Sequence, residues 1–519
     1  MELPCFPHGR VAKKADPSAR ERSGSIMACQ GRPHRVSSSP NPAPQPATDQ
    51  PPAAEGTADP RWLDPADQPA GRRNRMLVAY GLGDAGTGMA ASLIGFYLFV
   101  FYTKAAGLPP WMAGLVLMLA RLWDAVNDPI VGWLSDKTRT RWGPRLPWII
   151  GSALPLGTGM TLMWWLPPGG PWQKFAFFVG VSVLANSLYT CVNLPYSALA
   201  AELTTSVPLR TRLNTARFTG SIIAGLVGLV LGGLLLGDPT NASGYWRVGL
   251  LSGSIITVST LLCAWGIAPT AIHCQRPTSE KGTTRRLLGR VRNNGRFLMV
   301  LGLYLLLWCA LQLMQTAALI YLPDVMRVPP AWSTWILLPF QISTLAGLWL
   351  WTEVSRRHGR VRALHWGASL WMAGCLLAMV LIPLDAAIAP TGSPTNLLRL
   401  LCLIVAILLV GVGASTAYLI PWALLPDAID ADPEKPAGVY SAWMVFTQKI
   451  CISFALFFFG NLMSLSGYIA TKGVEQPQSA QVAIRLCMGL IPAVLVVLGL
   501  VVMRRWPERG LHLLRAESR

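Results

Sequence analysis

Charged residues interrupt an apolar stretch of this chain that is long enough to cross a bilayer. The segment LVLMLARLWDAVNDPIVGW, residues 115–133, carries Arg121, Asp124 and Asp128. Each charge at membrane depth costs about 2.5–3.5 kcal/mol, so three of them in one span point to a function. A helix repeats every ~3.6 residues, which predicts that the three side chains share one face.

Two carboxylates one helical turn apart repel each other in a low dielectric and stay ionised together only beside cations. Arg121 can supply one positive charge, and a transported Na⁺, or a proton on one acid, can supply the other. Carboxylate oxygens are the ligands that hard cations prefer. The pattern therefore indicates a protein that moves a solute across a membrane and couples the movement to an ion. The alternative is that Arg121 neutralises the acids and the group only holds helices together.

The composition is that of an integral membrane protein. Hydrophobic residues make up 52% of the 519 residues and charged residues 13%, whereas soluble domains carry about 25% charged residues. The net charge of +19 does not indicate nucleic-acid binding, because the basic residues fall in short segments between apolar spans. The ten cysteines form no CxxC pair, and there is no P-loop and no Ser/His/Asp arrangement. We expect a transporter with no cofactor, not an enzyme.

The chain divides into a polar start and a long apolar remainder. Residues 1–75 are rich in Pro, Ser and Ala, and we expect a disordered cytoplasmic tail, an over-extended start before Met27 or Met76, or a transit peptide. Apolar spans of about 20 residues or more follow. There are twelve of them: 77–103, 109–134, 147–167, 173–200, 216–237, 246–268, 297–322, 332–354, 364–386, 396–424, 437–467 and 481–503.

Basic residues gather before the first span and after spans 2, 4, 6, 8 and 12. The positive-inside rule therefore predicts that both termini are cytoplasmic, in a multi-pass protein of a cell membrane of the bacterial inner-membrane type. A basic linker at 269–296 separates an N-terminal half at 76–268 from a C-terminal half at 297–505, and 506–519 form a tail. We predict an all-α membrane protein with 12 transmembrane helices in two six-helix halves, the major facilitator fold.

Five segments then carry a family resemblance. RLWDAVNDPIVGWLSDKTRTRWGPRLPW at 121–148 closely resembles the second span and following loop of the glycoside–pentoside–hexuronide:cation symporters. Four further segments agree in order: YGLGDAGTG at 80–88, LYTCVNLPYSALAAELT at 188–204, LLPDAIDADPEKPAGVYS at 424–441 and FTQKICISFALFFFGNLMSLSGY at 446–468. The resemblance covers about residues 76–505.

The resemblance implies a cation site and a substrate site. The implied cation-binding residues are Asp124, Asp128, Asn127, Thr190 and Asn193. The implied substrate-binding residues are Asp84, Asn193, Arg217 and Lys449.

Two positions depart from the melibiose-type members of the family. Asn193 and Gly88 stand where those members have aspartates, so the identity of the sugar does not carry over. Asp84, one turn before Gly88, can bind sugar hydroxyls or pair with an arginine. Lys449 can serve the site or form a structural salt bridge to an acid of the opposite half.

The loop after the second span resembles the cytoplasmic gate of major facilitators, in which ion pairs hold one state and break in the other. The implied charge-network and gate residues are Arg121, Asp136, Arg139, Arg141, Arg145, Asp427 and Asp430. We expect secondary active symport of a sugar, glycoside or uronate with Na⁺ or H⁺, by a protein that is monomeric like its relatives and binds no nucleic acid. Two alternatives remain: a lysophospholipid symporter, and a scaffold or receptor that keeps the fold without transporting.

Overall fold

The computed structural model describes residues 64–204, 206–238, 240–271, 291–385, 388, 390–432, 437–471 and 475–506. All of them lie in one unit, Gly56–Arg519. Residues 1–63 of the predicted N-terminal tail therefore lie outside the described residues. Residues 272–290 of the predicted linker and residues 507–519 of the predicted C-terminal tail lie outside them as well. Residues 64–75, assigned to the tail from the sequence, contain the short 3-10 helix Pro65–Asp67 and the start of α1 at Ala70.

Each of the twelve predicted spans coincides with a helical segment. The first half contains α1 (Ala70–Leu93, continued by π-helical turns at Ile94–Leu98 and Phe101–Ala105), α2 (Pro110–Lys137), α3 (Leu146–Leu162), α4 (Pro171–Glu202), α5 (Val207–Leu236) and α6 (Ala242–Ala271). The second contains α8 (Gly295–Asp324), α9 (Pro330–His358), α10 (Arg360–Val380), α11 (Pro394–Ile429), α12 (Ala437–Leu465), and α13 (Gln478–Met488) followed by α14 (Leu490–Met503).

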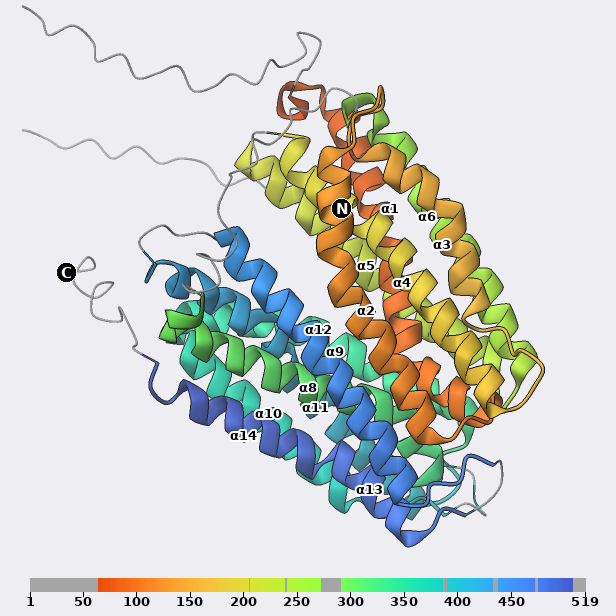
Figure 1. The fold of residues 1–519 in the computed structure, drawn as a ribbon. Coiled ribbons are helices and arrows are strands. Elements are labelled where there is room, and N and C mark those ends of the chain that lie inside the picture. The colour runs from red at the N-terminus through yellow and green to blue at the C-terminus, as the bar shows by residue number, and fades with distance from the viewer. Residues whose placement is uncertain are drawn as a thin grey trace, which may run out of the picture. The chain divides into compact units, whose positions relative to one another are not determined.

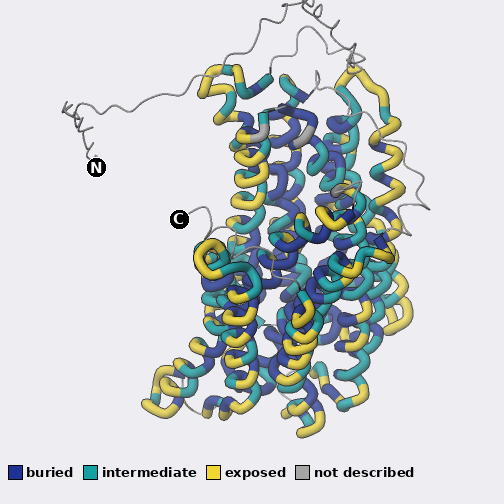
Figure 2. The backbone as a smooth tube through the Cα atoms, turned by 90° about the vertical axis from the view of Figure 1, so that its left-hand side faces the viewer, coloured by how far each residue is buried: buried dark blue, intermediate teal, exposed yellow. Residues whose placement is uncertain are grey.

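Length and composition within the described residues agree with a membrane protein. Nine of the helical segments are long and apolar enough to cross a bilayer, and α3 is apolar but shorter. Segment α1 is interrupted by the π-helical turns, and α2 carries the charges of residues 121–128. Large apolar side chains such as Trp349, Trp265 and Val380 are exposed on the outside of the bundle, where lipid tails would cover them. Figure 2 shows buried residues along the interior of the bundle and exposed ones on its outer sides and at helix ends.

Glycines set how closely neighbouring helices approach. In the first half, a Cβ on Gly88 of α1 would lie 2.3 Å from the carbonyl oxygen of Ser221 on α5. Between the halves, a Cβ on Gly114 of α2 would lie 3.0 Å from the Cα of Gly460 on α12. Small residues of this kind allow backbones in membranes to touch, and here they bring α2 and α12 together.

The contacts that join the halves are concentrated towards one end of the bundle. Besides the α2–α12 pair, α5 packs on α9, and the π-helical turn at 94–98 packs on α8. These contacts lie at the end opposite the basic loops, which we call the opposite end; the other is the basic end. Figure 1 shows the two halves close together near α13 and diverging away from it.

Candidate functional site

An acid pair lies between the two halves. Asp124 and Asp128 project from α2, and Lys449 reaches them from α12. Its Nζ lies 2.9 Å from Oδ2 of Asp124 and 2.5 Å from Oδ2 of Asp128. The Asp124 side chain is 2% exposed, the Lys449 side chain 19% and the Asp128 side chain 26%. The single positive charge of Lys449 therefore neutralises only one of the two negative charges, in a region that is largely shielded from water.

Thr190 of α4 completes this cluster from a third helix. Its hydroxyl lies 3.1 Å from Oδ1 of Asp124 and 3.2 Å from Oδ1 of Asp128. The hydroxyl has one hydrogen and can donate it to only one carboxylate at a time, so Thr190 lies between two alternative acceptors. Asn127 is buried on α2, and its amide nitrogen has no partner among the described atoms. Asn127 is therefore next to the acids in the sequence but makes no hydrogen bond to either of them among the described residues.

Arg121 does not supply the positive charge that pairs with the two aspartates. Within the described residues it forms no ion pair with either aspartate; Lys449 makes those contacts instead. Neutralisation by an arginine of the same helix is therefore corrected to neutralisation by a lysine of the opposite half. This is the salt bridge between halves that was one of the two expectations for Lys449.

A second polar cluster adjoins the first through α4. Arg217 on α5 donates from Nε to Oδ2 of Asp84 on α1 over 3.1 Å and from Nη2 to Oδ1 of Asn193 over 3.4 Å. Thr87 donates to the other Asp84 oxygen over 2.5 Å, and the guanidinium lies 5.4 Å from the ring centre of Tyr196. The arginine-pairing alternative for Asp84 is thus the one observed.

Helix α4 links the two clusters, because Thr190 and Asn193 are one turn apart. Thr190 faces the acid pair and Asn193 faces Arg217. Asn193 therefore lies with the implied substrate residues and not against the acids.

The predicted gate loop forms an ion cluster at the basic end. Nη2 of Arg145 lies 2.7 Å from Asp136 and 2.8 Å from Glu202, and Nη1 donates to Ser135 over 2.8 Å. The Glu202 side chain is 4% exposed. Burial raises the pKa of its carboxyl above the usual value, and the charge and hydrogen bond of Arg145 oppose that shift. Sequence reasoning missed Glu202, although it stands inside the quoted segment at 188–204.

Of the other residues predicted for the gate, only some form ion pairs. Arg360 lies 2.9 Å from Asp427, an equivalent pair in the second half. Arg141 lies over the ring of Trp142 at 5.5 Å, outside the ion cluster. Arg139 forms no ion pair with a described residue, and Asp430 caps the end of α11.

A further ion pair, not expected from the sequence, joins the halves at the opposite end. Nζ of Lys104, at the end of the first span, lies 2.7 Å from Oδ1 of Asp324 at the end of α8. Tyr468, beyond α12, donates to Oδ2 of Asp324 over 2.7 Å. The Lys104 and Asp324 side chains are 10% and 13% exposed. Its only signal in the sequence is a single charge at the end of each of two apolar spans.

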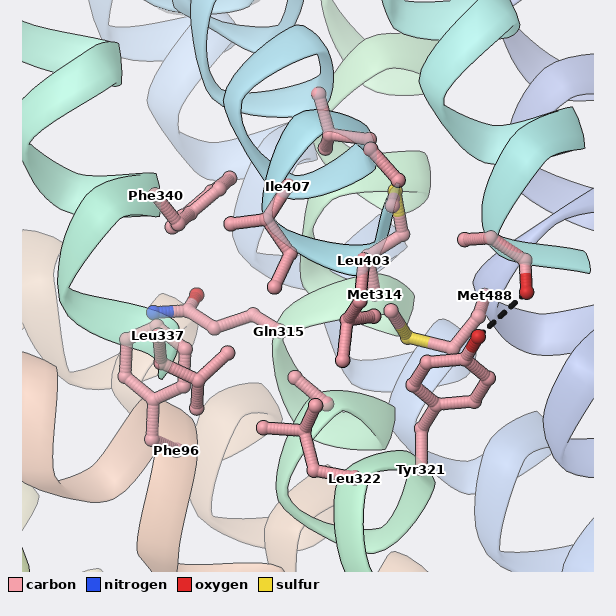
Figure 3. A pocket seen from close by; sticks show the side chains of 14 residues that line it. Phe96, Met314, Gln315, Tyr321, Leu322, Leu337, Phe340, Leu403, Ile407 and Met488 are labelled. Carbon is pink, nitrogen blue, oxygen red and sulfur yellow. Dashed lines mark hydrogen bonds between the residues drawn. The ribbon is translucent and has the colours of Figure 1, made fainter. Parts of the chain in front are cut away.

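An apolar pocket lies in the second half of the protein. Figure 3 shows side chains of α8, α9 and α11 around it, with the amide of Gln315 projecting among them. Phe96 of the first span closes one side, so the cavity touches the boundary between the halves. Its lining suits an alkyl chain, and Gln315 offers one polar contact.

Comparison with known proteins agrees with this architecture. The family model described as MFS/sugar transport protein matches residues 79–508. An uncharacterized symporter of Synechocystis is 29% identical, with 84% of this chain and 94% of that protein covered. The sodium-dependent lysophosphatidylcholine symporter 1-A of Danio rerio is 23% identical, with 83% and 85% covered.

Solved structures extend the comparison to the fold. The nucleoside transporter NupG superimposes with a TM-score of 0.59 over 83% of this chain and 99% of that one, at 13% identity. Such a likeness supports the twelve-helix fold and says nothing of the substrate. With the family match, the chain is a transporter and not an enzyme. It belongs to the MFS/sugar transport family of major facilitators, as one of the glycoside–pentoside–hexuronide:cation symporters.

Proposed function

We propose that the protein couples the uptake of a sugar, glycoside or uronate to the entry of Na⁺ or H⁺. The observation that carries this proposal is the acid pair of Asp124 and Asp128, balanced by a lysine from the opposite half. The three charges leave one carboxylate unbalanced in a place where an uncompensated charge is costly. A monovalent cation or a proton would remove that imbalance.

The cation and Lys449 compete for the same oxygens in this proposal. A cation that binds Asp124 and Asp128 weakens the hold of Lys449 on α2, and with it one polar link between the halves. A substrate held by Arg217 and Asn193 would lie one helical turn along α4 from Thr190, whose hydrogen bonds to the acid pair change when the cation binds. Reciprocity requires that substrate raise cation affinity by the same factor.

The two ends would open alternately. The basic end is taken as cytoplasmic from the positive-inside rule. In the state described, Lys104, Asp324 and Tyr468 hold the opposite end closed. The change to the outward-open state must break this ion pair, while the clusters of Arg145 and Arg360 provide charges that can meet across the closing basic end.

A lysophospholipid is the second candidate substrate, and the apolar cavity of the second half favours it. An acyl chain would lie among Phe96, Leu403 and Ile407, with Gln315 near its polar end. The relative from Danio rerio is named for sodium-dependent transport of such a lipid. The polar cluster around Arg217 favours a hydroxyl-rich substrate or a uronate, because a planar guanidinium suits paired hydroxyls or a carboxylate.

The deciding experiment uses purified full-length protein in liposomes. Uptake of pooled sugars, uronates and lysolipids is measured under an imposed Na⁺ or H⁺ gradient. The variants are Asp124→Asn and, as a matched control, Asp67→Asn, which changes an exposed aspartate outside the membrane spans. Gradient-driven uptake that is lost in the first variant and kept in the second supports coupling at the acid pair. Gradient-driven uptake that persists in Asp124→Asn would exclude coupling at the acid pair.

The same assay separates the alternatives. Accumulation of a lysolipid and of no sugar would select the second candidate. Folded protein that neither transports nor binds any of the compounds would favour the scaffold or receptor.

A further inference from the structure

Two cysteine side chains meet between α8 and α12, near the middle of both helices. The sulfur atoms of Cys309 and Cys451 lie 2.8 Å apart, although the residues are 142 positions apart in the sequence. Both are free thiols in the structure. Beside them the hydroxyl of Tyr304 donates to Oε1 of Gln448 over 2.8 Å. Gln448 and Cys451 are three residues apart and share a face of α12, so this hydrogen bond holds the two helices together next to the sulfurs.

The spacing of the sulfurs suits a disulfide and does not suit a metal ion. An S–S bond is about 2.05 Å long, so small side-chain rotations bring Cys309 and Cys451 into bonding distance. A zinc ion about 2.3 Å from each sulfur, with tetrahedral geometry, would hold the two sulfurs well beyond the observed 2.8 Å. Nor do the described residues contain a group of three or more His, Cys, Asp or Glu side chains that could hold a metal ion. The chemistry open to this pair is therefore oxidation.

The exposed side of Cys451 faces away from the first half of the protein. Gly460 of α12 packs on Gly114 of α2. A helix turns by about 100° per residue, which places Phe458 on the side of α12 opposite Gly460 and Cys451 within about 20° of Phe458. Phe458 is 49% exposed and Cys451 is half-buried, whereas Cys309 is buried. Cys451 is therefore the thiol that a reagent can reach, and it is reached from the bilayer.

We propose that Cys309 and Cys451 form an oxidisable dithiol whose oxidant is a hydroperoxide dissolved in the bilayer. The sulfur of Cys451 attacks the terminal oxygen of the hydroperoxide, the O–O bond breaks, an alcohol leaves with the thiol proton, and Cys451 becomes a sulfenic acid. The sulfur of Cys309 then attacks the Cys451 sulfur, an S–S bond forms, and water leaves with the second thiol proton. The two thiols lose two electrons, which reduce the hydroperoxide.

The surroundings set the relative rates of the two steps. Apolar surroundings disfavour the thiolate, so the first step is slow. The second step is fast, because the two sulfurs are already in contact.

The new bond would fix the turn of α12 that carries the lysine of the acid pair. Lys449 lies two residues before Cys451, and its ammonium contacts Asp124 and Asp128. A bond that forms in this arrangement favours it over any arrangement in which the sulfurs separate. Oxidation therefore keeps the ammonium on the acids and opposes the cation that must displace it. This effect rests on the proposed cation coupling, whereas formation of the disulfide does not.

The test uses full-length protein in nanodiscs, treated with cumene hydroperoxide, which dissolves in lipid. Free thiols are then alkylated, and disulfide-linked peptides are identified by mass spectrometry. Wild type is compared with Cys451→Ala, and the matched control is Cys402→Ala, because Cys402 is also a half-buried free cysteine. Tryptophan fluorescence follows Na⁺ binding at alkaline pH, and proton binding without Na⁺, before and after oxidation. Reduction of oxidised wild type by dithiothreitol adds a comparison that needs no variant.

We expect a peptide linked through Cys309 and Cys451 in oxidised wild type and in Cys402→Ala, and none in Cys451→Ala. Oxidation should weaken cation binding by wild type about fivefold or more, and dithiothreitol should restore it. Cys451→Ala should bind the cation equally before and after oxidation. Absence of the linked peptide would overturn the dithiol, and a linked peptide with unchanged cation binding would overturn its effect on the acid pair. If neither Na⁺ nor protons bind to reduced wild type, the proposed coupling falls, while a linked peptide still supports the disulfide site.

Discussion

Replacing Lys449 by methionine tests whether the lysine competes with the transported cation. Methionine keeps much of the length and apolar bulk of the side chain but leaves Asp124 and Asp128 without their ammonium. In wild type an incoming cation must displace or share that ammonium. In Lys449→Met the carboxylates are free, so we expect tighter cation binding.

The size of the effect follows from the contacts. Two charges about 4 Å apart attract by about 4 kcal/mol at an effective dielectric of ~20. Removing one partner of a buried pair costs about 3–5 kcal/mol. Lys449 is 19% exposed and reaches some water, so the low end applies. About 3 kcal/mol corresponds to roughly a hundredfold lower Kd for Na⁺ or a proton.

The assay is a Na⁺ titration of purified protein at constant ionic strength, followed by tryptophan fluorescence or calorimetry at two pH values, so that proton competition is separated. Lys174→Met is the matched control, because Nζ of Lys174 donates to the carbonyl of Ala106 over 2.9 Å and forms no ion pair with a described acid. Its Kd should equal that of wild type. Weaker cation binding in Lys449→Met would refute competition and make the lysine a support of the cation site.

Three further predictions concern the neighbouring hydroxyl and the two ends of the bundle. Thr190→Val should weaken cation binding by about 1 kcal/mol, roughly fivefold, in the same titration, and an unchanged Kd would remove Thr190 from the site. Lys104→Met should raise the labelling of Ser333→Cys by an impermeant maleimide about tenfold, because the closed opposite end loses an ion pair and exposes Ser333, which is 4% exposed near the start of α9. Equal labelling would show that this ion pair does not hold the opposite end closed. Arg145→Gln should lower the thermal unfolding midpoint by about 5 °C or more by leaving a buried carboxylate unpaired, whereas exposed Arg72→Gln should not, and equal midpoints would contradict the burial argument.

The helices could be predicted because the length of an apolar run is a local property of the sequence, and the thickness of the bilayer sets the length that a span needs. The span expected at 297–322 is Gly295–Asp324, and that at 332–354 is Pro330–His358. The π-helical turns after α1 and the break at Gly489 were not predicted. Such features depend on small shifts in backbone hydrogen bonding, which leave no trace in hydrophobic pattern.

The site was predictable in its acids and not in its partners. Asp124 and Asp128 are visible because charges in an apolar run are locally anomalous. Lys449 is 321 positions from Asp128, and whether it or Arg121 reaches the acids depends on how each helix is rotated about its axis. The pairing of Lys104 with Asp324 has the same origin, since it arises only when two halves meet.

The contact of Lys449 with the acid pair also bears on membrane voltage. With both acids ionised, two negative charges and one positive charge leave a net charge of −1 between the halves. One bound monovalent cation brings that charge to zero. A potential of 100 mV changes the energy of one charge that crosses the whole field by about 2.3 kcal/mol. The voltage would therefore act on the reorientation of the empty carrier and leave the cation-loaded step nearly unaffected.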